Sequence, residues 1–392
     1  MNPMNRGAGL LALTNIPAPY RIPTFNWLAQ HSGGRLRVAF IAPGDPRRNW
    51  DQNFEGTDFE LTFLSRSPNG IGLLASAAAA VRAVVLLRRS NPAGVICGGY
   101  DSLAAWASFL WCKAKRRRFV LWLESNARDQ RTPGRLKNWL KRWIVSRADA
   151  IGASGQATAE YVRQLGAREE QIFIAPFGGD NRLFTRKAAQ VDAAREKSER
   201  GWPERLVMYS GRLVVEKGVF VLLEAFRRIS QRLPDAGLLM VGHGPELEAM
   251  QEFCRRHDLN RVYFTGPQPY ENMPFFYALA DILVLPTFSD AWGFVVNEAF
   301  ACGVPALVSR VAGACDDLIV EGETGYGLEP GNTEELASKM LRLLEDPELR
   351  ARMSANCRER VKPYSARTCA EGLLAAVKGE RRNLAESTVR AM

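Results

Sequence analysis

The sequence predicts an α/β protein with two domains, each built on a doubly wound parallel sheet. Three observations carry this prediction: a length of 392 residues, a repeated alternation of short apolar runs with longer amphipathic ones, and one polar stretch near the middle. A chain of this length exceeds what one hydrophobic core usually supports. Short β-branched runs that alternate with helical patterns are typical of βαβ units.

The first domain is predicted at residues 1–186. Its expected strands are short apolar runs, and amphipathic segments lie between most of them. These strands are expected at 10–13, 36–41, 93–97, 119–123, 149–153 and 171–175.

A linker is predicted at 187–204, because this stretch has few large apolar residues and ends in Trp-Pro. The second domain follows at 205–364, and a C-terminal helix at 365–392 is expected to cross back toward the first domain. Strands of the second domain are expected at 206–209, 238–241, 262–264, 282–285 and 306–309.

The seven cysteines are scattered and form no C-x-x-C pair, which argues against a disulfide framework and a structural zinc site. The N-terminus has no long apolar region of the kind found in secretory signals, and no apolar stretch reaches the length of a spanning helix. We therefore expect a cytoplasmic protein, with peripheral contact to the inner face of the plasma membrane as an additional location.

Charge is distributed unevenly along the chain. Residues 1–185 carry 25 Lys and Arg against 13 Asp and Glu, whereas the remainder carries 27 against 29. The N-terminal half is therefore strongly basic. Such asymmetry indicates that this half faces a polyanion, which could be an anionic membrane, a phosphorylated lipid or a nucleic acid.

Two loops of the second domain favour a phosphate ligand. Strand 206–209 runs into Gly211, Arg212 and Lys217, and the next strand ends in a turn that contains Gly244. Both loops lie at carboxyl ends of strands, where open α/β sheets bind their ligands, and two cations there suit a diphosphate. Taken alone, each loop is explained equally well as a solvated or sterically required turn.

The most informative segment runs from strand 282–285 through Asp290 into a helix that carries Glu298. Amides in the first turn of that helix can bind a phosphate or sugar hydroxyls. Asp290 and Glu298 stand eight positions apart, so both can address one elongated polar ligand. The predicted amide donors are Gly293, Phe294, Val295 and Val296.

Together the motifs GRLVVEKG, GHGPE and D-x7-E, followed by A-x-A-C-G-x-P-A, resemble the large GT-B family of retaining glycosyltransferases, family 4-like members included. The resemblance covers the C-terminal domain and implies two Rossmann-like domains that face each other across a cleft. In that family the acidic pair is usually two glutamates, so Asp290 is a departure that bears on the identity of the sugar.

The resemblance also implies roles for individual residues. Arg212 and Lys217 would neutralise the donor diphosphate, Glu298 would take the ribose hydroxyls, and Asp290 would address hydroxyls of the transferred sugar. Gly211 and Gly244 would let the backbone approach the donor, and Pro267 would lie in the loop that recognises the base.

On the acceptor side, Glu124 follows strand 119–123 and is the candidate for binding or polarising the acceptor hydroxyl. The alternative is that Glu124 pairs with a nearby arginine. The opening around Tyr20 and Arg21 resembles a subgroup of bacterial polysaccharide-assembly transferases, in which these residues would line the acceptor side, with Arg21 suited to a lipid-linked phosphate. Gly99 is a further candidate, although a steric turn also explains it.

No metal site and no cofactor are expected. The chain has three histidines and no D-x-D triplet, and fixed cations at the leaving group would lower the barrier directly.

Two stretches of the basic half combine aromatic residues with cations: 106–118 and 137–143. Trp beside Lys and Arg suits a lipid headgroup region, so we expect docking to an anionic membrane surface. The alternative is that Trp106, Trp139 and Trp143 fill the domain core and that the acceptor is soluble.

The function we predict is therefore a retaining hexosyltransferase. It would move a sugar from a nucleotide sugar, with UDP favoured, to a saccharide or a polyprenyl-diphosphate-linked saccharide of a bacterial surface polysaccharide or glycolipid. The alternatives are a nucleotide-sugar epimerase of the same fold and a non-catalytic basic protein that binds membrane or nucleic acid. No recognised nucleic-acid-binding module is found, so nucleic acid is not an expected partner. Donor sugar, acceptor, linkage and oligomeric state are not specified by these residues.

Overall fold

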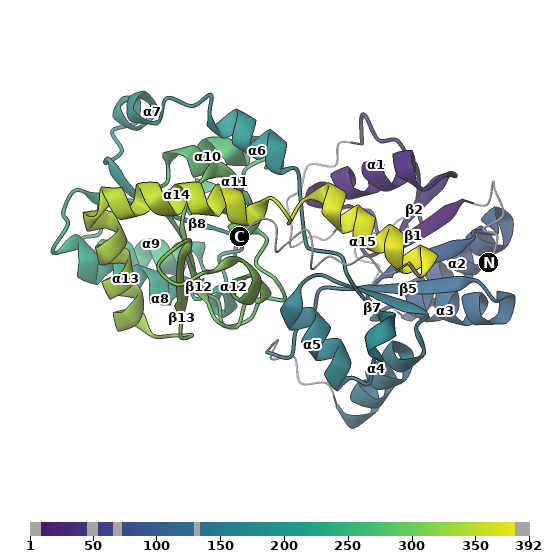
Figure 1. The fold of residues 1–392 in the computed structure, drawn as a ribbon. Coiled ribbons are helices and arrows are strands. Elements are labelled where there is room, and N and C mark those ends of the chain that lie inside the picture. Colours follow the sequence, from purple (N-terminus) through teal and green to yellow (C-terminus); the bar gives the residue numbers. More distant parts are fainter. Residues whose placement is uncertain (1–8, 45–53, 66–72, 129–133, 381–392) are drawn as a thin grey trace. The chain divides into compact units, whose positions relative to one another are not determined.

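The structure is a computed structural model that describes residues 9–44, 54–65, 73–128 and 134–380. It contains two parallel sheets, one of seven strands and one of six, each with helices on its faces (Figure 1). The predicted fold class, two doubly wound α/β domains, is thereby confirmed. The chain divides into two compact units that separate at Gly179/Asp180 and again at Lys362/Pro363.

The seven strands of the N-terminal unit are ordered β3-β2-β1-β4-β5-β6-β7. Every neighbouring pair is parallel, and β1 is buried along its whole length, as a strand covered on both faces should be. The strands are β1 (Leu10–Thr14), β2 (Leu36–Phe40), β3 (Glu60–Phe63), β4 (Gly94–Gly98), β5 (Arg118–Leu123), β6 (Ala150–Ala153) and β7 (Ile172–Ile174).

Two helical layers cover this sheet. Helices α2, α3, α4 and α5 bury apolar side chains in one core cluster, whereas α1 and α15 contribute to a second cluster on the opposite face. Their bounds are α1 (Ile22–His31), α2 (Leu73–Ser90), α3 (Leu103–Lys115), α4 (Arg135–Arg147), α5 (Gln156–Gln164) and α15 (Ala366–Lys378).

Helix α15, from the end of the chain, packs within the N-terminal unit against β5, β6, β7 and α1. Ser365 caps it by accepting a hydrogen bond from the Thr368 amide at 3.1 Å. Gly372 lets the helix approach β7 closely, because a Cβ atom at this position would lie only 2.2 Å from the Ile174 carbonyl oxygen.

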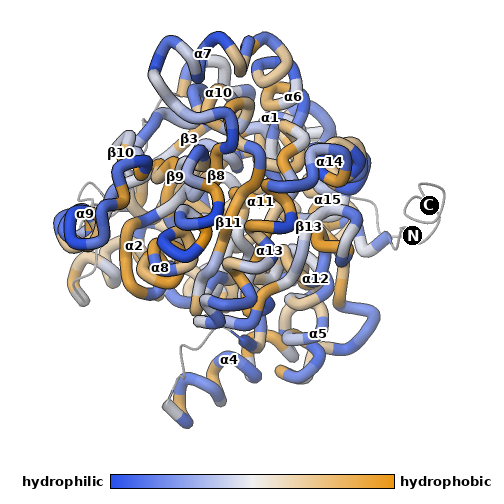
Figure 2. The backbone as a smooth tube through the Cα atoms, turned by 90° about the vertical axis from the view of Figure 1, so that its left-hand side faces the viewer, coloured by the Kyte–Doolittle hydropathy of each residue, from blue (hydrophilic) through white to orange (hydrophobic). Residues whose placement is uncertain are grey.

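The C-terminal unit has six strands ordered β10-β9-β8-β11-β12-β13, all parallel. Figure 2 shows β8 and β11 as apolar and α9 and α14 as largely hydrophilic, as expected for strands inside and helices outside. The strands are β8 (Arg205–Ser210), β9 (Ala236–Val241), β10 (Val262–Gly266), β11 (Ile282–Leu285), β12 (Ala306–Ser309) and β13 (Gly325–Leu328).

Within the described part of the chain this unit has nine α-helices, and the residues of the expected linker, 187–204, lie within it and include α7. The helices are α6 (Asn181–Ala188), α7 (Ala193–Glu199), α8 (Val219–Ser230), α9 (Leu247–Arg256), α10 (Met273–Leu279), α11 (Val295–Cys302), α12 (Gly313–Leu318), α13 (Thr333–Glu345) and α14 (Pro347–Val361).

Two strands, β3 and β13, were not expected from the sequence. The edge strand β3 begins at Glu60 and is exposed or half-buried throughout, so it lacks a continuous apolar run. Strand β13 has the sequence GYGL, in which two glycines hide the β pattern.

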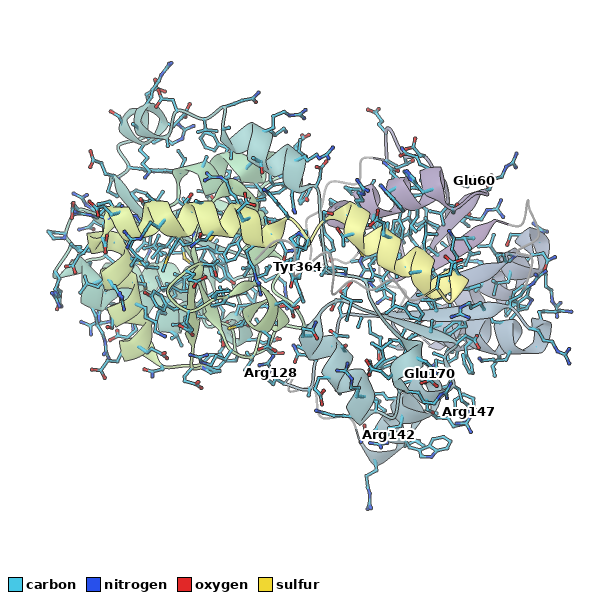
Figure 3. The ribbon with its side chains drawn as sticks, viewed as in Figure 1. Glu60, Arg128, Arg142, Arg147, Glu170 and Tyr364 are labelled. Carbon is cyan, nitrogen blue, oxygen red and sulfur yellow. The ribbon has the colours of Figure 1, made fainter. Side chains whose placement is uncertain are left out.

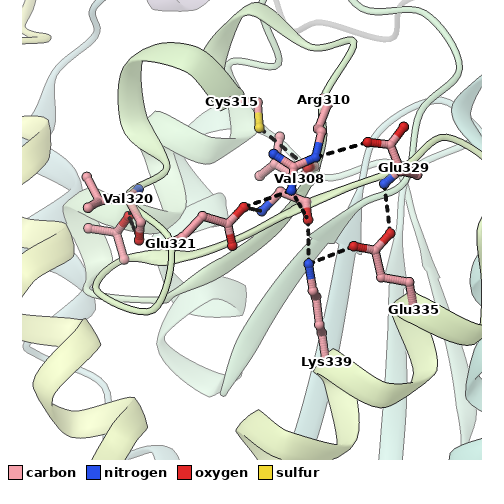
Figure 4. Close-up of polar contacts among 10 residues, drawn as sticks. Val308, Arg310, Cys315, Val320, Glu321, Glu329, Glu335 and Lys339 are labelled. Carbon is pink, nitrogen blue, oxygen red and sulfur yellow. Dashed lines mark hydrogen bonds and ion pairs between the residues drawn. The ribbon is translucent and has the colours of Figure 1, made fainter.

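A network of charged side chains holds β12, β13 and α13 together (Figure 4). Arg310 contacts the carboxylates of Glu321 and Glu329 at 3.0 and 3.2 Å. Lys339 donates to Glu335 and to the Gly327 carbonyl oxygen, both at 2.7 Å. Each cation bridges two elements and so supports the packing of α13 at this edge of the sheet, although exposed pairs of this kind add at most about 1 kcal/mol each.

Candidate active site

The loop after β8 is seated against the loop after β11. Gly218 has a φ of +69° and ends the short turn Val215–Lys217, just where α8 begins. A Cβ atom at Gly218 would lie 2.0 Å from the Pro286 carbonyl oxygen, so only glycine allows this contact. The contact brings the Lys217 side chain to the polar loop that precedes α11.

Lys217 and Asp290, both predicted site residues, form an ion pair. Lys217 Nζ donates to Asp290 Oδ2 and to the Ser289 carbonyl oxygen, each at 2.8 Å, and both side chains are largely buried. Asp290 Oδ1 accepts the Trp292 amide at 3.2 Å. The aspartate therefore orients the ammonium group, which has three N–H donors and uses two of them in these contacts.

The loops after β8 and β9 are joined by main-chain hydrogen bonds. Gly211 N donates to Val241 O, and Leu213 N donates to His243 O, both at 3.0 Å. A Cβ atom at Gly244 would lie 2.1 Å from the Leu213 carbonyl oxygen. Gly244 thus has the steric role that the sequence left open, because only a residue without a side chain lets the two loops approach this closely. The buried Tyr209 hydroxyl adds a hydrogen bond to the Arg212 carbonyl oxygen at 2.7 Å.

Glu298 is buried on α11 and has a phenol as its partner. Tyr277 of α10, which the sequence analysis missed, donates its hydroxyl to Glu298 Oε2 at 2.7 Å. Burial raises the pKa of Glu298 from 4.5 to about 7, against the lowering effect of the Tyr277 hydrogen bond. Burial also raises the pKa of the Tyr277 hydroxyl. No spacing signal points to Tyr277, because it stands in an ordinary buried helix.

The N-terminus of α11 is organised by side chains as well as by the backbone. Trp292 Nε1 donates to Asn297 Oδ1 at 2.8 Å, and both residues are buried. Of the predicted amide donors, Val296 N already donates to Gly293 O at 3.0 Å. Phe294 is the residue before the first helical position, and its carbonyl oxygen accepts the Asn297 and Glu298 amides.

The loop after β10 borders a cavity. Gln268, next to the predicted base-recognition residue Pro267, donates Nε2 to the Thr265 carbonyl oxygen at 2.8 Å. The cavity has a volume of about 500 Å³, and Gln268 lines it together with Arg200 and Phe275. The Arg200 guanidinium lies over the Phe275 ring at 4.9 Å.

In the N-terminal unit, Arg21 and Glu124 form an ion pair. Arg21 also donates to Thr14, and its guanidinium lies 4.7 Å from the centre of the Trp122 ring. This ion pair agrees with the alternative interpretation, in which Glu124 is a partner for a nearby arginine. A role of the pair in binding the acceptor stays a prediction.

The other two acceptor-side candidates are Tyr20, in a turn after β1, and Gly99, directly after β4. Tyr20 packs edge to face on Phe177, with ring centres 5.4 Å apart. Gly99 follows β4 with a φ of +96°, and its amide donates to Trp122 O at 3.0 Å. Arg21, Gly99 and Glu124 therefore lie around the neighbouring strands β1, β4 and β5, whereas Tyr20 packs on Phe177, which follows β7.

Within residues 9–44, 54–65, 73–128 and 134–380, no three His, Cys, Asp or Glu side chains are grouped as a metal site would require. In the same described part of the chain, no helix combines the length and apolar character needed to cross a bilayer.

Two family models match the chain, one in each half. The model for a "Glycosyl transferase 4-like domain" matches residues 24–178, and that for "Glycosyl transferases group 1" matches residues 190–360.

Among curated proteins, N-acetyl-alpha-D-glucosaminyl L-malate synthase of Bacillus anthracis is 30% identical over 57% of this chain and 58% of its own length. Alpha-D-kanosaminyltransferase of Streptomyces kanamyceticus is 31% identical over 58% of this chain and 59% of its own. The chain thus spans about three fifths of the length of these relatives.

Among solved structures, Anabaena Alr3699/HepE in complex with UDP and glucose superposes with a TM-score of 0.76 at 19% identity, over 95% of this chain and 99% of that one. Sucrose-phosphate synthase of Thermosynechococcus elongatus also gives a TM-score of 0.76, at 20% identity, over 98% of this chain and 100% of that one. At these identities the likeness establishes the fold.

Proposed function

We propose that the chain is a retaining, UDP-sugar-dependent hexosyltransferase. This proposal rests on its family, because the chain belongs to the glycosyltransferases that have a 4-like N-terminal domain and a group 1 C-terminal domain. The observation that carries the proposal is the convergence of the β8 loop, the β11 loop and α11 in one unit. This convergence brings Lys217 to within 2.8 Å of Asp290, on the loop that leads into the helix of Glu298. A UDP-sugar is favoured because Alr3699/HepE was solved with UDP, glucose and UDP-glucose.

Transfer breaks the bond between the anomeric carbon and the diphosphate oxygen, and the bonding electron pair leaves with the nucleoside diphosphate. Lys217 and Arg212 would stabilise the negative charge that develops on this leaving group. The acceptor hydroxyl supplies the new oxygen, and its proton passes to the departing diphosphate oxygen. Asp290 would hold the ammonium group in position, and Glu298 would accept the ribose hydroxyls.

We assign acceptor binding to the N-terminal unit, around Arg21 and Glu124. A guanidinium suits a phosphate group, so the acceptor we propose is a polyprenyl-diphosphate-linked saccharide at an anionic membrane surface. The product would be a bacterial surface polysaccharide or glycolipid. Fixed cations at the leaving group remove the need for a divalent metal, and we therefore expect transfer to continue in the presence of EDTA.

Lys217→Ala tests the donor-site assignment. The assay measures hydrolysis of UDP-, GDP- and ADP-sugars together with 31P signals of released nucleotide, and thermal melting monitors the fold. We expect one nucleotide class to be hydrolysed by the wild type, and hydrolysis to fall at least about a hundredfold in the variant.

A matched control is Lys197→Ala. Lys197 also pairs with an aspartate, Asp281 at 3.3 Å, and its side chain is as exposed as that of Lys217, but it lies away from the β11 loop. Equal activity of both variants, or undiminished hydrolysis by Lys217→Ala, would contradict the donor site. Release of an epimerised sugar without any transfer product would favour an epimerase.

A further inference from the structure

Exposed apolar side chains are concentrated on three helices of the N-terminal unit. In the described residues eight large apolar side chains are exposed, and all except Val215 lie on α2, α3 and α4. We call the outer faces of these helices the three-helix surface. Its apolar members are Leu74, Val81 and Val85 on α2, Leu103 and Leu110 on α3, and Leu136 and Trp139 on α4.

The three helices form one layer. All of them bury their inner sides in the same core cluster, on the same face of the sheet. Helix α3 packs against α2, and it meets α4 through the stacked rings of Trp106 and Trp143, whose centres are 5.9 Å apart. Leu103 and Leu110 stand seven positions apart, and so do Leu74 and Val81, so each pair shares one face of its helix.

The three helices carry charge of a single sign, and the neighbouring carboxylate Asp149, which follows α4, pairs with Lys113 of α3 at 2.5 Å. The segments that form α2, α3 and α4 contain ten Lys and Arg residues and no Asp or Glu. Nine of the ten cations are exposed, and Lys141 is half-buried. The excess positive charge of the N-terminal half is therefore carried largely by the same helices that expose apolar side chains.

The first half of α4 is the most exposed part of the layer. Every residue at 134–139 is exposed, with Leu136 at 70% and Trp139 at 58%. Arg142 and Arg147 on the same helix are labelled in Figure 3. Trp106 and Trp143 are partly buried against the core, so the core interpretation of the three tryptophans is wrong for Trp139.

We propose that the three-helix surface docks on an anionic lipid bilayer, with the first half of α4 inserted among the headgroups. Trp and Leu next to Lys and Arg match the interfacial region, where an aromatic ring and an aliphatic chain enter the acyl boundary while cations meet lipid phosphates. A second copy of this chain fits the surface poorly, because pairing it with itself would oppose cation to cation, and none of the three helices carries an Asp or Glu to pair with them.

The test uses the full chain and sedimentation with vesicles of neutral phosphatidylcholine, with or without about 30 mol% phosphatidylglycerol, at ~0.05 M and ~0.5 M NaCl. We expect binding to the anionic vesicles, weakened by salt. Lys137→Glu with Arg142→Glu should lower the partition coefficient at least about fivefold for each charge. Leu136→Ser with Trp139→Ser should lower it at least about tenfold.

Matched controls separate docking from general effects. Arg232→Glu with Arg352→Glu removes two exposed cations of the C-terminal unit, and Asn138→Ser changes an exposed residue of α4 without loss of apolar area. Both should bind vesicles like the wild type. Failure of the wild type to bind anionic vesicles, equal losses in surface and control variants, or concentration-dependent dimers abolished by the Leu136 and Trp139 substitutions would each overturn the proposal.

The inference is independent of the donor site. Hydrolysis of a soluble nucleotide sugar should be the same in the Leu136 and Trp139 variant as in the wild type, whether or not vesicles bind. Loss of vesicle binding with intact hydrolysis therefore tests the three-helix surface alone, whereas loss of hydrolysis tests the proposed function.

Discussion

Replacing Glu298 by glutamine should remove most of a pH-dependent loss of stability. The pKa of Glu298 is 4.5 when the side chain is exposed to water and about 7 in the folded protein, because burial penalises the charged form. Between these two values the folded protein binds a proton that the unfolded chain has released. The free energy of unfolding must therefore fall as the pH rises through this window, and it levels off above about pH 7.

The size of the effect follows from the shift. A difference of about 2.5 pKa units corresponds to about 3 kcal/mol at pH values above the window. Glutamine keeps the acceptor oxygen for the Tyr277 hydroxyl but carries no charge, so Glu298→Gln should be more stable than the wild type by up to that amount at about pH 8. Below about pH 4.5 the two proteins should be equally stable.

Urea unfolding at a series of pH values measures this difference, with the transition of the C-terminal unit followed separately where two transitions appear. Glu204→Gln, which neutralises an exposed carboxylate of the same unit, is the control and should leave the pH profile unchanged. A Glu298→Gln profile that runs parallel to that of the wild type would refute the assignment of the shift to this residue.

The same variant should bind UDP more weakly, because an amide accepts fewer hydrogen bonds from ribose hydroxyls than a carboxylate does.

Two further substitutions test how the backbone positions the site and the last helix. Gly218→Ala should weaken UDP binding, measured by calorimetry, at least about tenfold, because a Cβ atom at a φ of +69° collides with a carbonyl oxygen of the β11 loop. Gly372→Ala should lower the free energy of unfolding of the N-terminal unit by about 2 to 3 kcal/mol, because α15 must move away from the Ile174 carbonyl oxygen. Urea unfolding measures this difference, and an unchanged unfolding midpoint would contradict the close approach of α15 to β7.

Strands in the middle of a sheet were predictable because burial on both faces leaves a run of apolar residues in the sequence. Strand β11 was expected at 282–285 and lies at Ile282–Leu285. Strands β3 and β13 left no such run, since one is a partly exposed edge and the other contains two glycines. Helix α7, within the expected linker, has no buried residue, so its pattern is that of a polar connection.

Asp290 and Glu298 belong to one continuous motif, so the sequence alone singled them out, and their role in a donor site stays a prediction. Their partners were not. Glu124 pairs with Arg21, which is 103 positions away in the sequence, and Tyr277 reaches Glu298 from a different helix. Such pairs depend on which elements the fold brings together, and one sequence read along its length contains no spacing that encodes them.

In the proposed donor site, the ion pair between Lys217 and Asp290 would prepare the ammonium group for a ligand. A lysine left alone in this largely buried position would bear the full desolvation cost of its charge. Asp290 compensates that cost, and the Trp292 amide keeps the aspartate from turning away. An incoming diphosphate would then meet an ammonium group already charged and oriented, so little reorganisation is required when negative charge develops on the leaving group.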